Sequence, residues 1–372
     1  MEKTGIGIVG VGAISGIYLQ NLTQTFKEVY VTGICDLIPE RSEKAKEEYK
    51  DYDIKIYKDM HELFADPEVG IVLNLTRPYE HFEVTKAALM AGKHVYSEKS
   101  LGACLEEGQE LYKLAKEKGL VIGGAPDTFL GAGLQTCRKL IDDDMIGTPV
   151  AAQSFYLSRG HETWHPDPEF YYQFGAGPML DMGPYYVTAL VSLLGSVTTV
   201  SGMTGKAYDQ RTITSQPHYG KIVDVEVATH LTGTMRFENG VMCTMTASFD
   251  CFPHKQLPYI IIFGTKGNIL LPDPNYFEGP VMIKRTTDAE YHEMPLLYDD
   301  YIENSRGLGV ADMAKALRTG RKPRCHMDLT MHALEVLSAF QRSSDSGTHI
   351  KIESRTERPE PRKFDMMNGI LD

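Results

Sequence analysis

The first 36 residues constrain the fold of this chain more than any other segment. A short apolar run over residues 5–9 is followed by the turn Gly10-Val11-Gly12, and a helical pattern comes next. A second apolar run over residues 29–35 then ends in Asp36. A strand, a glycine turn, a helix and a second strand ending in an acid are typical of a dinucleotide-binding unit.

Each residue type in this segment has a physical reason to be there. Gly10 permits the tight turn, and Gly12 lets the backbone approach a pyrophosphate that any Cβ would meet. A helix that opens near Ala13 and Ile14 points free N–H groups at the phosphates. Asp36 follows at the spacing expected for an acid that binds ribose hydroxyls. The alternative is a glycine-rich turn without a ligand.

The acid also bears on which dinucleotide is bound. Asp36 would repel the 2′-phosphate of NADP, and Leu37 beside it offers no positive charge. Arg41 lies one helical turn further on and could hold that phosphate, so NADP stays as the less favoured alternative. We therefore predict NAD.

Bulk properties restrict the class of protein. The 372 residues suit two domains, and a formal net charge of −12 disfavours nucleic acid or an acidic membrane as partner. No segment approaches the ~20 apolar residues of a membrane span. The six cysteines show no C-x-x-C spacing, and the N-terminus shows no secretory signal. We expect a cytoplasmic protein with free thiols.

Periodicity divides the chain into two domains and a tail. Over 1–124, strand and helix patterns alternate, which predicts a Rossmann domain with a doubly wound parallel sheet. Over 125–354, β-rich runs dominate, and they predict an α+β domain with a large, mostly antiparallel, open sheet. Helices are expected there at 130–145, 179–194, 309–318 and 329–343. The charged, proline-rich tail over 355–372 is either a surface strap or a loose end.

An open antiparallel sheet leaves one face to cover. We therefore expect self-association through the second domain, as a homodimer or homotetramer.

Lys99 is the first candidate for chemistry. It follows the predicted strand 94–96, at the carboxyl edge where open α/β sheets bind ligands. In a partly dry cleft beside a nicotinamide cation, desolvation and like charge would lower the pKa of this lysine. A neutral amine could then exchange a proton near neutral pH. The alternative is a solvated surface lysine.

Asp181 and Tyr185 form a second candidate pair in the segment 177–186. Asp181 is expected near the start of a helix, and residues four apart share a helix face, so both side chains could reach one cleft. Pro184 fits only a first helical turn. The alternatives are a helix N-cap for Asp181 and a half-buried core position for Tyr185.

A third candidate is an aromatic loop that could cover a sugar. Aromatic faces stack on the apolar faces of sugars, while polar groups bind the hydroxyls. The loop residues assigned to substrate are Arg159, His161, Trp164, His165 and Tyr172. His161 and His165 have the spacing of metal ligands on a helix, but the prolines at 166 and 168 argue against a helix there. No metal is therefore predicted.

Taken together, these motifs resemble the Gfo/Idh/MocA oxidoreductases, a family of sugar and cyclitol dehydrogenases, over roughly residues 4–350. The marks are the glycine loop, Thr76-Arg77-Pro78 with His81, the segment 92–99 (G-K-H-V-Y-S-E-K), Ile146-Gly147, and Asp181-Met182-Gly183. The resemblance implies that Lys99 transfers a proton or orients substrate. It also implies that Glu98, Thr76, Pro78 and His81 lie near the nicotinamide ribose.

The chain departs from the family pattern twice. Ser100 stands in place of the proline of E-K-P, and Tyr185 stands in place of the histidine of D-x-G-x-H. A phenol is a poorer base than imidazole at neutral pH. We therefore expect Lys99 to act as the main acid/base with Tyr185 as a hydrogen-bond donor, rather than a Tyr185 whose pKa is lowered by nearby charge.

These observations predict an NAD-dependent oxidoreductase that passes a hydride between the nicotinamide and a carbinol carbon of a sugar, polyol or cyclitol. Lys99, Asp181 and Tyr185 are the expected catalytic residues. Two alternatives stay open. One is a glycoside-processing enzyme that oxidises a carbon transiently and eliminates a substituent. The other is a non-catalytic, dinucleotide-dependent sensor.

Overall fold

The computed structural model describes residues 3–253, 256–364 and 368–372. Its first sheet has six parallel strands in the order β3-β2-β1-β4-β5-β6. The strands are β1 (Thr4–Val9), β2 (Val29–Cys35), β3 (Lys55–Ile56), β4 (Ile71–Asn74), β5 (His94–Ser97) and β6 (Ile122–Gly124). The strand order reverses between β1 and β4, and ligands of doubly wound sheets bind at the carboxyl edge of such a switch point. The predicted fold of this domain is confirmed.

Helices cover both faces of this sheet, which explains why its strands are almost continuously apolar. They are α1 (Ser15–Gln20), α2 (Pro39–Glu48), α3 (Met60–Ala65), α4 (His81–Met90) and α5 (Leu105–Lys118). Strands β4 and β5 are buried at nearly every position. This rigid layer fixes where the loops after β1, β4 and β5 begin.

The second sheet has nine strands in the order β16-β15-β14-β13-β7-β12-β11-β8-β17. Among the described strands of this sheet, only β7 and β12 pair in parallel. The strands are β7 (Pro149–Leu157), β8 (Val197–Gly205), β11 (His230–Phe237), β12 (Met242–Ser248), β13 (Ile260–Gly264), β14 (Gly267–Leu271), β15 (Val281–Arg285), β16 (His292–Met294) and β17 (Ile350–Lys351). A separate two-stranded hairpin joins β9 (Gln210–Thr212) to β10 (Ile222–Asp224).

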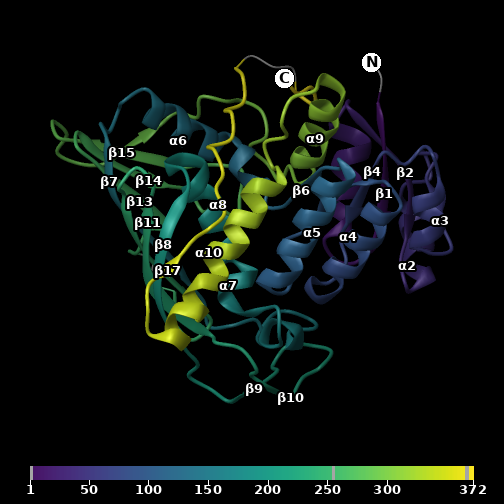
Figure 1. The fold of residues 1–372 in the computed structure, drawn as a ribbon, viewed down its shortest axis with the longest axis horizontal. Helices are drawn as coiled ribbons and strands as arrows, with labels where there is room; N and C mark the ends of the chain where they lie inside the picture. Colours follow the sequence, from purple (N-terminus) through teal and green to yellow (C-terminus); the bar gives the residue numbers. More distant parts are fainter. Residues whose placement is uncertain (1–2, 254–255, 365–367) are drawn as a thin grey trace.

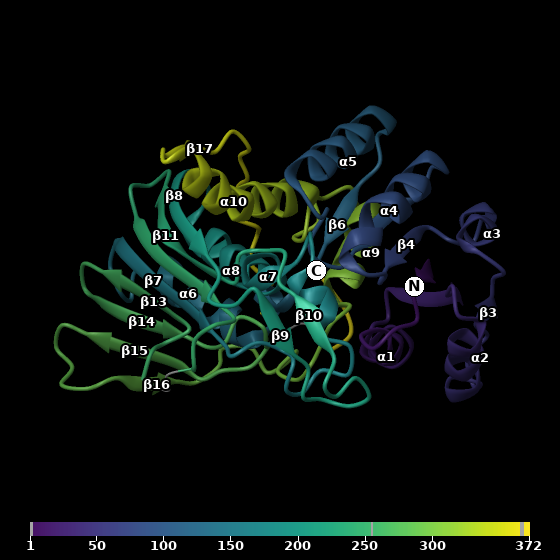
Figure 2. The same cartoon turned by 90° about the horizontal axis from the view of Figure 1, so that it is seen from below.

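Only the inner face of the nine-stranded sheet is covered by helices in the part of the chain that the structure describes (Figures 1 and 2). The helices packed on it are α6 (Ala132–Asp142), α8 (Gly183–Leu194) and α10 (Met327–Ser346). Side chains of β12 alternate between buried and exposed accordingly. The outer face carries apolar side chains, with Met203 76% and Met242 58% exposed.

Late segments of the chain return to the first domain (Figure 1). Helix α9 (Leu308–Thr319) packs against β6, and the amide of Gly124 donates to the carbonyl of Cys325. The tail is a strap rather than a loose end over its described residues, because the buried Arg362 pairs with Asp300 and Arg324 pairs with Asp372.

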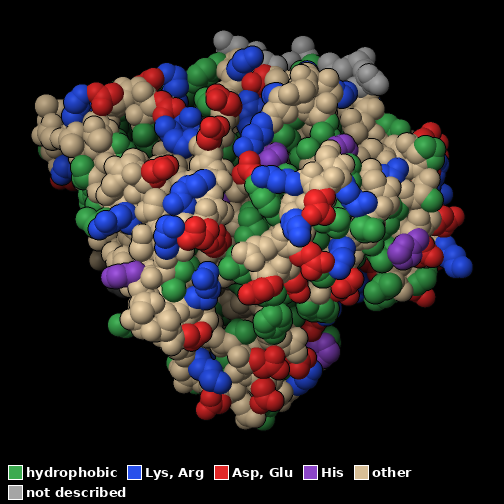
Figure 3. Space-filling view, viewed as in Figure 1, with side chains coloured by type: hydrophobic (Ala, Val, Ile, Leu, Met, Phe, Trp, Pro, Cys, Tyr) green, Lys and Arg blue, Asp and Glu red, His purple; other side chains and the backbone are tan. Residues whose placement is uncertain are grey.

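One face of the molecule carries charges of both signs, with acidic and basic side chains interspersed (Figure 3). Among the described residues, no helix combines the length and apolar character that crossing a bilayer requires. The helix expected over 179–194 is two helices, α7 (Gly177–Asp181) and α8.

Candidate active site

The glycine turn after β1 has the shape of a phosphate cradle. Gly10 has φ +95°, and a Cβ there would meet the backbone of Leu75 at 2.8 Å. No atom lies within 4 Å of the position that a Cβ of Gly12 would occupy. The space beside Gly12 is therefore open to a ligand, and a side chain would fill it. These features fit a dinucleotide pyrophosphate.

Asp36 sits beside this turn, at the end of β2. Its Oδ2 accepts a hydrogen bond from the amide of Val11 at 2.6 Å, and its Oδ1 accepts from the amide of Ile38 at 2.8 Å. The guanidinium of Arg41 lies 3.6 Å from Oδ1. The acid is thus held where the ribose of a dinucleotide on the glycine turn would lie.

Buried polar groups fix the loops that follow β4 and β5. The Asn74 amide oxygen accepts from the hydroxyl of Thr76 at 2.6 Å. The ring nitrogens of His81 lie 2.9 Å from the carbonyls of Thr76 and Ser100. Because both ring nitrogens face main-chain carbonyls and the side chain is buried, His81 positions the two loops. Pro78 opens the short turn Pro78–Glu80 between them.

Glu98 is tied to the first helix. Its Oε1 accepts from the hydroxyl of Tyr18 at 2.7 Å, and its Oε2 accepts from the amide of Lys99 at 3.0 Å. The guanidinium of Arg306 faces Glu98, Tyr185 and the buried Asp127. Arg306 comes from an irregular loop before α9 with no sequence pattern, so sequence reasoning missed it.

Lys99 spans the two domains. Its Nζ donates to both the Oδ1 and the main-chain carbonyl of Asp181, each at 2.7 Å. The two side chains are only 18% and 12% exposed. The same Nζ lies 5.5 Å from the ring centroid of Tyr185. The structure therefore brings the three expected catalytic residues together.

The expected protonation state of Lys99 is wrong for this structure. Burial by itself lowers the pKa of the amine, but the nearby Asp181, Tyr185 and Glu98 outweigh it, and the pKa is raised above its usual value. The ammonium form is stabilised because a carboxylate lies in direct contact in a poorly solvated cleft. Lys99 is charged, not neutral, at neutral pH.

Asp181 and Tyr185 occupy positions different from those expected along the helix. Asp181 is the last residue of α7, and Tyr185 lies in the first turn of α8, where Pro184 is accommodated. Burial raises the pKa of the Tyr185 phenol, and the charge of Lys99 offsets only part of the rise. The phenol keeps its proton at neutral pH, so it can donate a hydrogen bond.

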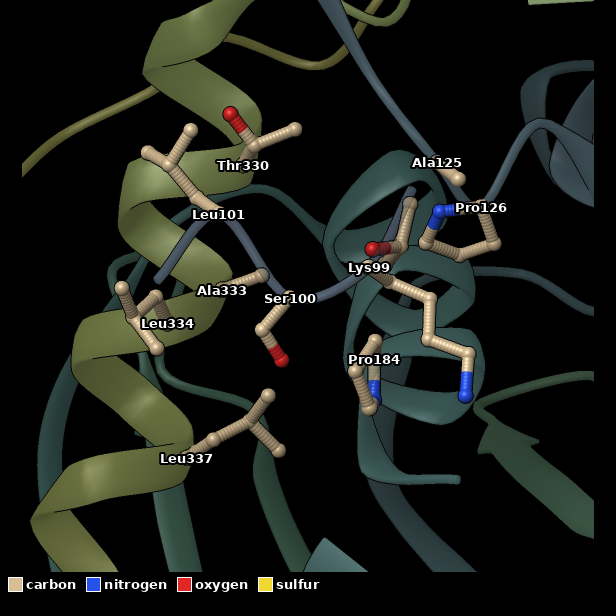
Figure 4. A pocket seen from close by; sticks show the side chains of 11 residues that line it. Lys99, Ser100, Leu101, Ala125, Pro126, Pro184, Thr330, Ala333, Leu334 and Leu337 are labelled. Atoms are coloured by element: carbon tan, nitrogen blue, oxygen red, sulfur yellow. The ribbon is translucent and has the colours of Figure 1, made fainter. Parts of the chain in front are cut away.

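Ser100 lines a small pocket of mixed polar and apolar character beside Lys99 (Figure 4). The Lys99–Ser100 peptide is cis. Figure 4 shows the Ser100 hydroxyl pointing between Pro184 and Leu337, while the Lys99 side chain extends to the other side of the main chain. Lys99 is thus directed away from helix α10 and toward Asp181.

His161 packs in an aromatic slot beside Asp181. Its ring stacks on Tyr171 with centroids 3.8 Å apart and meets the edge of Phe249 at 4.7 Å. Its Nε2 lies 3.5 Å from Oδ2 of Asp181. Burial lowers the pKa of His161 to about 4, although Asp181 opposes that shift. The imidazole is therefore neutral at neutral pH.

Of the other loop residues assigned to substrate, Trp164 and His165 lie beside His161, whereas Arg159 points elsewhere. Trp164 is 63% exposed and lies against the rings of His161 and His165. Arg159 is turned toward Tyr208 and Phe252 instead of toward Lys99.

The assignment of Tyr172 to substrate is wrong for this structure, because the side chain is fully buried and its hydroxyl donates to Glu162. The neighbouring Tyr171 stacks on His161 instead. No helical or strand period runs through this loop, so the sequence could not tell which tyrosine faces the cleft.

An ion pair links the loop after β4 to the aromatic loop. Arg77, in the loop after β4, lies 2.9 Å from Asp167 in the aromatic loop, and both side chains are substantially exposed. Over the described residues, no three His, Cys, Asp or Glu side chains converge in a way that could hold a metal ion.

The strand order, the open glycine turn and the acid after β2 define the first domain as an NAD-binding Rossmann domain of an oxidoreductase. The family comparison agrees. Residues 4–124 match the oxidoreductase family with an NAD-binding Rossmann fold, and residues 134–270 match the GFO/IDH/MocA C-terminal domain. The chain belongs to the GFO/IDH/MocA family.

Individual relatives share at most about a third of their residues with this chain over the matched segments reported below. The chain is 33% identical over 149 residues to the inositol 2-dehydrogenase/D-chiro-inositol 3-dehydrogenase of Lactiplantibacillus plantarum, which covers 40% of this chain and 42% of that relative. An NAD-binding oxidoreductase from Klebsiella pneumoniae has a similar fold, with TM-score 0.80, 18% identity, and coverage of 94% of this chain and 99% of that one. Levoglucosan dehydrogenase in complex with NADH gives TM-score 0.78 at 18% identity, covering 95% and 100%.

The Lys99–Asp181 contact makes a testable prediction. Asp181→Asn removes the negative charge that opposes desolvation, so the pKa of Lys99 is expected to fall relative to the wild type. The amine nitrogen chemical shift, followed against pH in protein labelled with ¹⁵N-lysine, measures this pKa. Asp167→Asn is the control, because the carboxylate of Asp167 pairs with Arg77 and not with Lys99. This change should leave the pKa of Lys99 as in the wild type. An unaltered Lys99 titration in Asp181→Asn would contradict the contact.

Proposed function

We propose that this protein is an NAD-dependent oxidoreductase that interconverts a carbinol and a carbonyl group in a sugar, polyol or cyclitol. The observation that supports this most strongly is the ammonium of Lys99 bridging from the carboxyl edge of the Rossmann sheet to Asp181 of the second domain. That edge is where a dinucleotide on the glycine turn would place its reactive end. Bound NAD would supply the hydride acceptor.

The chain's own residues orient and polarise the reacting oxygen. The charged Lys99 donates a hydrogen bond to that oxygen and stabilises the negative charge that develops on it. The phenol of Tyr185 is a second donor, because its raised pKa keeps it protonated. Asp181 holds the amine in place and accepts from a neighbouring substrate hydroxyl.

The substrate class follows from the surroundings of this pair. Trp164 presents a largely exposed aromatic ring that contacts the rings of His161 and His165. An exposed ring bordered by hydrogen-bonding groups suits a ring-shaped polyhydroxylated molecule, whose apolar face stacks while its hydroxyls are bound.

A panel of sugars, glycosides and inositols tested with NAD checks this function. Net formation of NADH is expected with at least one compound, and Lys99→Met should lower kcat by roughly 100-fold, because it removes a charged donor to the reacting oxygen. Lys86→Met, a change to an exposed lysine paired with Glu110, is the matched control. Cleavage of a glycosidic bond without net NADH would favour the glycoside-processing alternative, and dinucleotide binding without either reaction would favour the sensor.

Cofactor choice is tested at Asp36. Wild type is expected to bind NAD at least tenfold more tightly than NADP, and Asp36→Ala should weaken NAD by about tenfold through loss of a charged hydrogen bond. Asp36→Asn removes the charge but keeps one acceptor oxygen, so it can retain one of the two hydrogen bonds that the carboxylate accepts from the amides of Val11 and Ile38. Fluorescence titration measures both dissociation constants. Tighter binding of NADP by the wild type would overturn the assignment.

We also propose that the outer face of the nine-stranded sheet joins copies of this chain as a homodimer or homotetramer. Exposed methionines on β8 and β12 support this. Light scattering should give a mass that is a multiple of 41.6 kDa. The double change Met203→Lys with Met242→Lys should produce monomers, whereas Tyr52→Lys on the first domain should not. A monomeric wild type would contradict the proposal.

A further inference from the structure

The buried imidazole of His161 has a ring nitrogen without a hydrogen-bond partner. Among the described residues, neither ring nitrogen takes part in a hydrogen bond, and Nδ1 is completely buried without a partner. The side chain is 6% exposed. A buried polar group left unpaired costs about 1–3 kcal/mol, so such a group in a native structure calls for a reason. The aromatic rings of Tyr171 and Phe249 hold the imidazole but do not satisfy it.

The position of this ring suggests the reason. Nε2 lies 3.5 Å from Oδ2 of Asp181, whose Oδ1 is bonded to Lys99. Asp181 therefore stands between the charged amine and the imidazole. Carbinol oxidation requires a group that removes the hydroxyl proton. Lys99 is charged and Tyr185 keeps its proton, so neither can accept one at neutral pH.

We propose that His161 accepts the hydroxyl proton of the substrate, which Lys99 cannot do while it carries its charge. This inference rests on the proposed oxidoreductase function. It also accounts for a departure of the sequence, because position 185 of the D-x-G-x-H segment is tyrosine. An imidazole from a separate loop is then the base at the same carboxylate.

The step balances as follows. In the oxidation direction the substrate O–H bond breaks and its proton forms a bond with Nε2 of His161, while the hydride from the same carbon goes to the dinucleotide. The transfer uses the tautomer of the neutral ring that carries its proton on Nδ1, because only that tautomer has a free lone pair on Nε2. The resulting imidazolium is stabilised by the carboxylate of Asp181. In the reduction direction the imidazolium returns the proton.

The charges around His161 set the pH range of this role. Asp181 and Glu162 favour the protonated ring, whereas His165 and Lys99 disfavour it, and Tyr171 stacks on its face as a neutral phenol. Burial is the largest influence and keeps the ring neutral above about pH 4. The ring of His161 is therefore unprotonated throughout the neutral range.

Two substitutions at one position test the proposal. His161→Ala is expected to lower kcat by roughly 100-fold at neutral pH, and imidazole added to the solution should restore activity in proportion to its unprotonated form. His161→Gln retains a polar side chain but cannot take the proton, so it should stay as slow. His218→Ala, at an exposed position in the loop between β9 and β10, is the control. Circular dichroism confirms that each variant is folded.

The ring itself provides a readout that does not depend on activity. In ¹⁵N-histidine-labelled protein, identified by loss of the signal in His161→Gln, the ring should titrate near pH 4. Lys99→Met removes a positive charge and should move that midpoint upward. A midpoint that does not move overturns the proposal.

The outcomes also separate this proposal from the proposed function. If the wild type forms no NADH with any compound of the panel, the proposed oxidoreductase function is overturned. Turnover by the wild type that His161→Gln retains, or that imidazole does not restore in His161→Ala, overturns only the role of His161.

Discussion

The ion pair between Lys99 and Asp181 is the contact on which the rest of this site depends. It joins the loop at the carboxyl edge of β5 to the end of α7, and so links the two domains directly. Because both partners are mostly buried, removing either one would leave an uncompensated charge, at a cost of about 3–5 kcal/mol. The same contact also decides the chemistry, since it keeps the amine charged.

The edges of the cleft are prepared by polar groups that are satisfied within the protein. Asn74 and His81 hold the loop after β4, and Tyr18 holds Glu98 beside the lysine. A site whose surrounding loops are already tied loses little entropy when a ligand binds. The ring of His161 differs from these groups, because its buried Nδ1 has no hydrogen-bond partner.

Much of the fold could be predicted from local patterns, and much of the site could not. The buried strands of the first domain and the strands β11 and β12 follow the expected runs, since burial on one or both faces leaves a clear period. The break at Met182 was missed because α7 and α8 are separated by a single residue, so the helical period of the apolar side chains continues across the break. Tyr172 was mistaken for a cleft residue, and Arg306 was not noticed, because irregular loops carry no period that tells inside from outside.

The sequence by itself determined a nucleotide-binding first domain, an acid after its second strand, and a lysine at its carboxyl edge. These features follow from glycine conformation, strand order and spacing over short distances along the chain. Only the tertiary structure decided the charge of that lysine and the place of His161. Both depend on Asp181, which is 82 residues from Lys99 in the sequence and yet in direct contact with it. A pKa is set by neighbours in space, and local sequence does not record them.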